Sequence, residues 1–304
     1  MSLSQPHKKG LGDLPYELER EIFELTARAF PEFAPQLTLV CKYVQAWVEA
    51  VIYETIVLSF KHDRFLDTFS ARPPSFFART TRHLHIATGI SHSQARKLLE
   101  TCTSLTSLTC WSSLLTSIDE LSALLSSFPY LRRLSIDASF LWNPVYPPAI
   151  DHPLFSKLTH LEVVNPPWWF DWTPLLALPP LTHLAFGDLD AAHAAEPCNI
   201  LEFFARALES EVPQLEMLIA VSANEQFLRE VEDARLGQNL KKSGSEGKKD
   251  ERFVCLSSYH SPLSPLEFWK GVSRLEVDFW SQKRSEWEPK QMIQYMMIIE
   301  TMQG

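Results

Sequence analysis

Histidines are the residues whose type and spacing come closest to a chemical site in this sequence. His83, His160 and His183 each stand directly before a leucine in a recurring phrase, and imidazole is the commonest protein ligand for zinc. Ser107 and Arg133 hold the same place in the phrases between His83 and the other two histidines. Two neighbouring histidines without a cysteine or an arranged carboxylate are more often structural or solvated. We therefore expect no metal site.

The sequence also lacks the motifs that carry the common enzyme chemistries. GxGxxG, GxxxxGK[ST], HExxH and GxSxG are absent, and only nine glycines are present, whereas turns that cradle phosphate need glycine for close backbone approach. We expect a protein without catalytic residues or cofactor. A hydrolase whose serine, histidine and acidic groups meet only in the folded chain is the remote alternative.

Charge and composition exclude some classes of binding partner and favour one cellular location. The net charge of -9 removes the long-range attraction to phosphate, so neither nucleic acid nor an anionic membrane surface is an expected partner. No apolar run approaches the roughly 18 residues of a membrane span. The five cysteines are scattered without a CxxC pair, and no glycosylation sequon is present. These features favour an intracellular protein, cytoplasmic or nuclear.

One phrase recurs along the chain: leucine, two residues, leucine, one residue, and an apolar residue. The copies are Thr81-Leu84-Ile86 in degenerate form, Leu105-Leu108-Cys110, Leu131-Leu134-Ile136, Leu158-Leu161-Val163, Leu181-Leu184-Phe186 and Leu215-Leu218-Ala220. The intervals between their second leucines are 24, 26, 27, 23 and 34 residues, and all but the last match the roughly 20 to 29 residues of a leucine-rich repeat. The last interval is expected to contain an insertion.

Each phrase predicts a short strand, and the segments between phrases predict the return path. Residues 91–102, 117–128 and 198–210 have apolar residues at helical spacing, whereas the proline-rich segment 165–180 predicts an extended loop with at most one helical turn. The predicted fold is α/β, with a short helical module followed by an irregular, curved, parallel-sheet solenoid. An ordinary α/β domain with leucine-rich strands is the alternative.

The strand geometry also predicts a binding surface. Side chains alternate across a strand, so the residues beside the buried leucines face away from the core. This column contains His83, His85, Ser107, Thr109, Trp111, Arg133, Ser135, Asp137, His160, Glu162, Val164, His183 and Met217. We expect a protein partner on it, bound by His83, His85, Trp111, Arg133, Asp137, His160, Glu162 and His183.

Residues 13–58 predict a different unit, made of three helices. Asp13 is a candidate cap for a helix that begins near Pro15, and a break at Pro31 and Pro35 follows. Apolar spacing then predicts a short helix over 37–41 and another over 44–52. One interpretation is a cap that shields the open edge of the repeat core, which every solenoid needs.

The segments LPYELEREIFELTAR, APQLTLVCKYVQAWV and IYETIVLS resemble an F-box. With its repeats, the chain is similar to the F-box-like, leucine-rich-repeat proteins of mushroom-forming fungi. The resemblance implies a substrate receptor of a cullin-RING ubiquitin ligase, with the helices on the Skp-type adaptor and the repeats on the target protein. It implies adaptor docking through Leu14, Pro15, Leu18, Ile22, Val40 and Cys41. A leucine-rich-repeat interaction or scaffold protein without a ubiquitin role is the alternative.

The expected domains are the helical module at 11–58, the repeat domain at 59–285 and a tail at 286–304. A mobile charged loop is expected at 241–252, and further strands near Val254 and Val277. The tail is rich in methionine and isoleucine, and predicts either a capping helix or an exposed apolar segment. The aromatic cluster Trp168, Trp169, Phe170 and Trp172 either stacks on a ligand or packs over the core, and we favour packing.

Overall fold

The computed structural model describes residues 14–58, 63–86, 89–111, 123, 127–138, 155–194, 200–208, 214–231, 252–256 and 280. Several expected features lie outside these residues: the cap Asp13, almost all of the helix over 117–128, the loop 241–252, the strand near Val277 and the tail 286–304.

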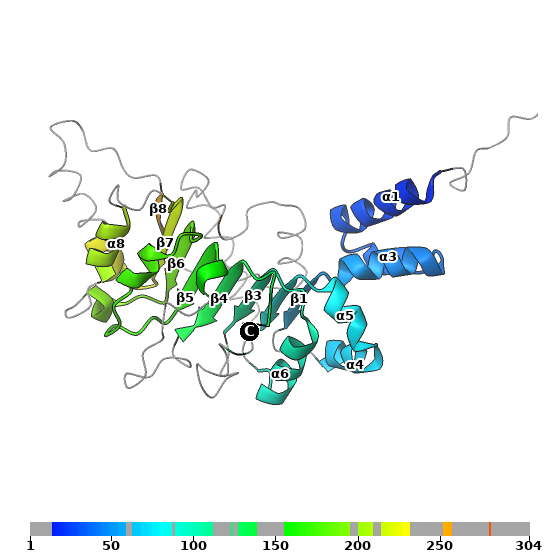
Figure 1. The fold of residues 1–304 in the computed structure, drawn as a ribbon, viewed down its shortest axis with the longest axis horizontal. Helices are drawn as coiled ribbons and strands as arrows, with labels where there is room; N and C mark the ends of the chain where they lie inside the picture. Colours follow the sequence, from blue (N-terminus) through cyan, green and yellow to red (C-terminus); the bar gives the residue numbers. More distant parts are fainter. Residues whose placement is uncertain are drawn as a thin grey trace, which may run out of the picture.

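Parallel strands in chain order form the centre of the fold (Figure 1). The described strands are β1 (Thr55–Leu58), β2 (His83–Ile86), β3 (Ser107–Cys110), β4 (Arg133–Asp137), β5 (His160–Val164), β6 (His183–Gly187), β7 (Met217–Val221) and β8 (Phe253–Leu256). Each strand pairs in parallel with the next one in the sequence. The protein is therefore an α/β protein with a parallel sheet, as its sequence predicts.

The recurring leucines account for this register. The second leucine of each phrase lies opposite the second leucine of the next, from Leu84 across Leu108, Leu134, Leu161 and Leu184 to Leu218. All of these leucines are buried in one continuous core, together with the first leucines of the five complete phrases. Leucine at a fixed place in each phrase thus aligns neighbouring strands, because a slip of one residue would turn every leucine outward.

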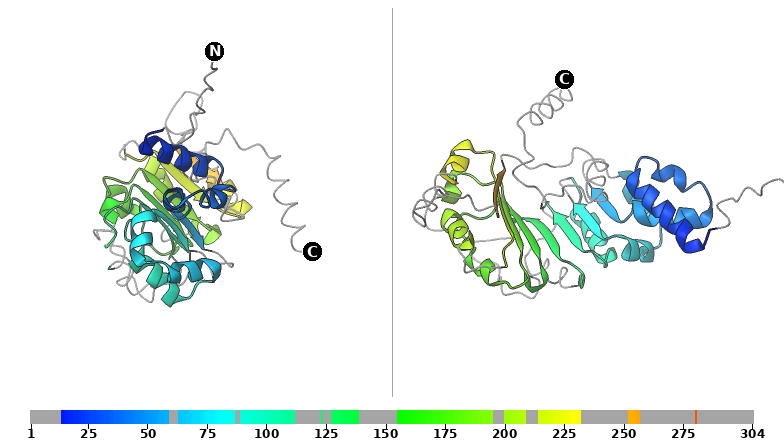
Figure 2. Two further views of the ribbon diagram at one scale, coloured as in Figure 1. Left: turned by 90° about the vertical axis from the view of Figure 1, so that its right-hand side faces the viewer. Right: turned by 90° about the horizontal axis from the view of Figure 1, so that it is seen from above.

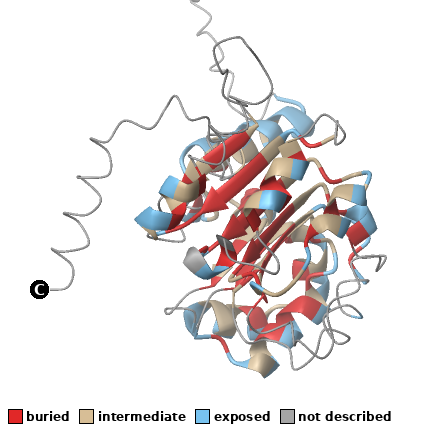
Figure 3. Ribbon diagram, turned by 90° about the vertical axis from the view of Figure 1, so that its left-hand side faces the viewer, coloured by how far each residue is buried: buried red, intermediate tan, exposed pale blue. Residues whose placement is uncertain are grey.

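Helices and short turns provide the return path on the core side of the sheet. They are α4 (Asp63–Ala71), α5 (Pro74–Thr80), α6 (His92–Thr101), η3 (Phe155–Lys157), η4 (Thr173–Ala177), η5 (Ala191–Ala194) and α8 (Ile200–Leu208). A further helical segment spans 225–231. Phe77 of α5, Leu98 of α6 and Phe203 of α8 belong to the same core as the strand leucines. In Figure 3 the strands are largely buried, and exposed residues gather on helices and turns.

Most local predictions for the described residues are confirmed. The helices expected over 91–102 and 198–210 are α6 and α8, and α6 begins with a capping box between Ser91 and Gln94. The proline-rich segment contains only the 3-10 turn η4. β8 is the strand expected near Val254.

The first helices form a module at the β1 end of the sheet (Figure 2). They are α1 (Tyr16–Ala29), α2 (Ala34–Leu37) and α3 (Lys42–Ile52). The second helix ends earlier than the segment 37–41 that its apolar residues predict, and its last residue is Leu37. α3 leads through two residues into β1, so the sheet begins inside the segment 11–58 that the sequence assigns to the module.

Among the described residues, no helix combines the length and the apolar character needed to cross a bilayer.

Candidate protein-binding surfaces

The helical module has a small core of its own. Ala27 from α1, Ala34 from α2 and Val44, Trp47 and Val48 from α3 are buried there. The Trp47 ring lies 4.7 Å from the Tyr16 ring and 4.9 Å from the Tyr43 ring, both in edge-on geometry. Edge-to-face aromatic pairs at such distances are favourable, so this cluster fixes the start of α1 on α3.

A second apolar stripe, which begins two residues before α1 and continues along it, is exposed. Leu14, Leu18, Ile22 and Leu25 follow one another at intervals of three and four residues, and their exposed fractions lie between 38% and 58%. Phe23 and Ala27 on the other stripe contact the core. A helix that is apolar on two sides while only one is buried has a second surface for a partner.

The exposed apolar side chains are concentrated in the module. Ten of the twelve large exposed apolar side chains in the described residues belong to it: Leu14, Tyr16, Leu18, Ile22, Leu25, Phe30, Phe33, Leu39, Val40 and Tyr43. Exposed apolar side chains gathered in a patch are typical of interaction surfaces, whereas scattered exposed leucines would need no explanation. We call Leu14, Leu18, Ile22, Leu25, Leu39 and Val40 the module face.

The expected docking residues divide between two environments. Leu14, Pro15, Leu18, Ile22 and Val40 are exposed, whereas Cys41 is half-buried and packs against the module core. Further exposed apolar residues of the module, for which the sequence predicted no docking role, are Leu25, Leu39, Tyr16, Tyr43, Phe30 and Phe33. The usable signal was the spacing of Leu25, which continues the stripe of Leu14, Leu18 and Ile22.

Charged side chains border the module face. Glu17, Arg20, Glu21, Glu24 and Arg28 line a shallow pocket on α1, together with Leu25 of the module face. Arg20 and Glu24 form an ion pair at 2.6 Å across one helical turn. A partner on the module face therefore meets an apolar stripe with a mainly acidic flank.

Two ion pairs connect the module to the sheet. Arg72, which follows α4, donates to both carboxylate oxygens of Glu49 on α3 at 2.6 and 2.7 Å, and Arg28 pairs with Glu54 just before β1. Burial raises the pKa of Glu49, but the hydrogen bonds from Arg72 and Gln45 outweigh burial and hold the pKa below its ordinary value. A bidentate pair of this kind fixes direction as well as distance, so it links α3 to the segment between α4 and α5.

The outward column of the sheet is in register as expected. His83, Ser107, Arg133, His160, His183 and Met217 form one row across β2 to β7. The row next to it is His85, Thr109, Ser135, Glu162, Ala185 and Ile219. The second row changes from polar residues at β2 to apolar residues at β7.

Much of this column is covered. His85, Ser135, Glu162 and Val164 are buried, with exposed fractions of 8% or less. His83, Trp111, Arg133, Asp137, His160 and His183 are half-buried. Asp137 accepts a hydrogen bond from Asn165 at 3.1 Å. Of the eight expected partner-binding residues, His85 and Glu162 therefore have little surface to offer.

Trp111 contacts Ser135 and His85, and the three residues form a cluster on β2 to β4. Its indole Nε1 donates to the Ser135 hydroxyl at 2.7 Å, and its ring lies 5.4 Å from the ring of His85. Burial lowers the pKa of His85 from 6.5 to about 4, so its imidazole is neutral near pH 7. Burial also lowers the pKa of His83, and the positive charge of Arg133 lowers it by a smaller amount.

His85 makes folding dependent on pH. Above pH 6.5 it is neutral in the folded and the unfolded chain, and between 6.5 and about 4 only the unfolded chain binds its proton. Its contribution to the free energy of unfolding is therefore full above pH 6.5 and falls by about 3 kcal/mol as the pH falls to 4. We expect His85→Gln to have a correspondingly flatter profile in urea unfolding at pH 4 to 7. Identical slopes for both proteins would contradict the burial of His85.

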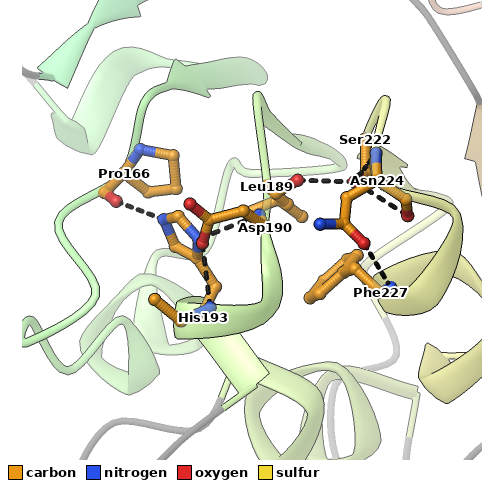
Figure 4. Close-up of polar contacts among 8 residues, drawn as sticks. Pro166, Leu189, Asp190, His193, Ser222, Asn224 and Phe227 are labelled. Atoms are coloured by element: carbon orange, nitrogen blue, oxygen red, sulfur yellow. Dashed lines mark hydrogen bonds and ion pairs between the residues drawn. The ribbon is translucent and has the colours of Figure 1, made fainter.

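A histidine–aspartate pair lies at the carboxyl ends of β5 and β6, and a serine follows β7 (Figure 4). His193 Nε2 lies 2.7 Å from the Pro166 carbonyl oxygen, and its Nδ1 lies 2.7 Å from Asp190 Oδ1. Ser222 donates to the Leu189 carbonyl and accepts from the Asn224 amide at 3.0 Å. The hydrogen bonds of Ser222 and His193 described above thus go to separate partners, and they link neighbouring loops.

The His193 contacts predict a measurable coupling. His193 is buried, and removing it leaves the Pro166 carbonyl without that donor. We expect His193→Ala to lower the free energy of unfolding by about 1 to 3 kcal/mol. Asp190→Ala should cost less, because Asp190 is exposed, and the double variant should be less destabilised than the sum. Strict additivity in chemical denaturation would show that the two side chains do not interact.

The remaining candidates for chemistry are a metal site, a reactive cysteine and the aromatic cluster. No group of three or more histidine, cysteine or acidic side chains is placed to hold a metal ion within the described ranges. Burial raises the pKa of the Cys102 thiol to about 12, so it does not supply a thiolate nucleophile near pH 7. In the aromatic cluster, Trp172 is buried against Phe186 at 5.2 Å, which confirms the packing interpretation for it, whereas Trp168 is exposed.

Comparison with known proteins leaves the family open. No protein-family model matches the chain, and a search of curated proteins found no match.

Proposed function

We propose that the protein is an F-box-like substrate receptor of a cullin-RING ubiquitin ligase, whose repeat sheet is a leucine-rich-repeat solenoid. The module face docks the Skp-type adaptor, and the outward face of the sheet binds the target protein inside the cell. The observation that carries the proposal is the exposed stripe Leu14, Leu18, Ile22 and Leu25, together with the exposed Val40 after α2. These residues include four that the resemblance to the F-box assigns to docking.

Two further observations support this role. The Glu49–Arg72 and Arg28–Glu54 pairs link the module to the segments next to the first strand, so an adaptor on the module and a target on the sheet would be carried by connected parts of one protein. The half-buried Arg133, Trp111 and His83 offer polar and aromatic contacts on the β2 to β4 part of the sheet. Arginine and tryptophan are frequent anchors of protein interfaces.

The alternative is a leucine-rich-repeat interaction protein in which the module only caps the sheet. The short passage from α3 into β1 favours it, because a cap must adjoin the first strand. In this alternative, however, the apolar side chains of the module face would remain exposed without a binding partner.

Size-exclusion chromatography of the full chain with a purified Skp-type adaptor separates the two. The proposal predicts a complex that elutes ahead of both components. Independent elution at micromolar concentrations would reject the ligase role and leave the capping role.

A further inference from the structure

His160 and His183 form a stacked pair on the outward face of the sheet. They are paired residues of β5 and β6, with ring centroids 4.1 Å apart and ring planes 11° apart. The ring of Trp280 stands edge-on to both, 5.1 Å from His160 and 5.9 Å from His183. A tryptophan from far along the chain therefore lies on the histidine pair.

The two imidazoles are held in place by the residues before them. Thr159 donates its hydroxyl hydrogen to the Arg132 carbonyl, and Thr182 donates to the Thr159 carbonyl, both at 3.2 Å. Each hydroxyl oxygen then accepts from Nδ1 of the next histidine, at 2.8 Å in both cases. The rings are thus oriented by the sheet itself, and a platform that is already ordered costs a ligand less to bind.

An apolar cluster continues the platform toward β8. Its buried members are Ala185, Ile219, Val221, Val254 and Leu256. Met217 and Trp280 pack against this cluster. Trp280 therefore contacts both imidazole rings and aliphatic side chains, which suits the apolar body and polar N–H of an indole.

We propose that the His160–His183 pair and the adjoining apolar cluster form a recognition site for a tryptophan side chain of a protein partner. Trp280 is the resident occupant, and a target segment binds here by displacing it. The inference rests on the proposed function in one respect, namely that the sheet is the target-binding part, and it does not need adaptor docking. Trp280 belongs to the same chain as the site, so a target must compete with it.

The site can be tested in the full chain by proton NMR of the histidine rings, with N-acetyl-tryptophanamide as the probe. His160→Gln and His183→Gln assign the two ring signals. We expect Trp280→Ala to move both signals, and Trp168→Ala, which removes an exposed tryptophan elsewhere, to leave them in place. Trp280→Leu, which keeps apolar packing on the cluster, serves as the second variant if the alanine variant does not fold.

The probe should bind the Trp280 variant at least about tenfold more tightly than the unmodified chain, because the tethered indole no longer competes. N-acetyl-leucinamide should show no comparable gain. Ring signals that do not respond to Trp280→Ala would overturn the contact itself. Equal probe affinity with and without Trp280, or an equal gain for the leucine compound, would overturn the tryptophan site while leaving adaptor docking untouched.

Discussion

Ile22→Asp is expected to weaken binding of a purified Skp-type adaptor at least about 100-fold. Ile22 lies in the middle of the stripe formed by Leu14, Leu18 and Leu25, and 44% of its surface is exposed. A carboxylate at this position would be desolvated in an apolar interface without a hydrogen-bond donor or a positive charge to compensate. The neighbouring Glu21 and Glu24 add electrostatic repulsion. Calorimetric titration of the full chain with the adaptor measures the change.

The fold should survive this substitution, which makes the result interpretable. An exposed side chain outside the module core contributes little to folding, and we expect a change in unfolding free energy within about 0.5 kcal/mol. Tyr130→Asp is the matched control, because Tyr130 is 56% exposed and lies just before β4, outside the module. It should leave adaptor affinity unchanged. Equal losses for both variants, or none for Ile22→Asp, would remove the module face as the docking site.

Phe186→Ala is expected to lower the free energy of unfolding by about 3 to 5 kcal/mol. Phe186 is the apolar residue that closes the phrase on β6, and it is fully buried. Its ring lies 5.2 Å from Trp172, 5.4 Å from Phe203 and 6.0 Å from Phe204. Truncation removes this packing and leaves a cavity among large rings that cannot close fully.

Urea denaturation followed by circular dichroism measures this effect. Phe30→Ala is the same chemical change at a position that is 52% exposed, and we expect it to alter the free energy of unfolding by no more than about 0.5 kcal/mol. Similar values for the two variants would contradict the placement of the recurring phrases in one shared core.

The sheet was predictable because its signal is repeated. Leu84, Leu108 and Leu134 mark the same strand position in successive phrases, and alternation along a strand then assigns each neighbour to one face. The helices of the module were predictable for a related reason, since apolar spacing and prolines set their approximate limits. β1 was placed within the module, because Ile56 and Leu58 stand in a segment without the full leucine phrase.

The candidate sites were harder to predict. Periodicity says on which face a side chain lies, but it does not say what covers that face. His85 and Glu162 are outward by alternation and yet buried, and Trp280 lies on His160 although nothing in the sequence links the two positions. The module face posed the opposite problem. Leu18 and Phe23 are both strongly apolar, and the sequence does not show that Leu18 is exposed while Phe23 packs against the module core.

Hydrogen exchange of the full chain, with and without a purified Skp-type adaptor, tests the adaptor role most directly. Docking on the module face should slow amide exchange across residues 14–43 and leave β4 to β7 unchanged. Protection confined to the strands, or no protection within 14–43 at saturating adaptor, would contradict the proposal that this protein is a ligase receptor.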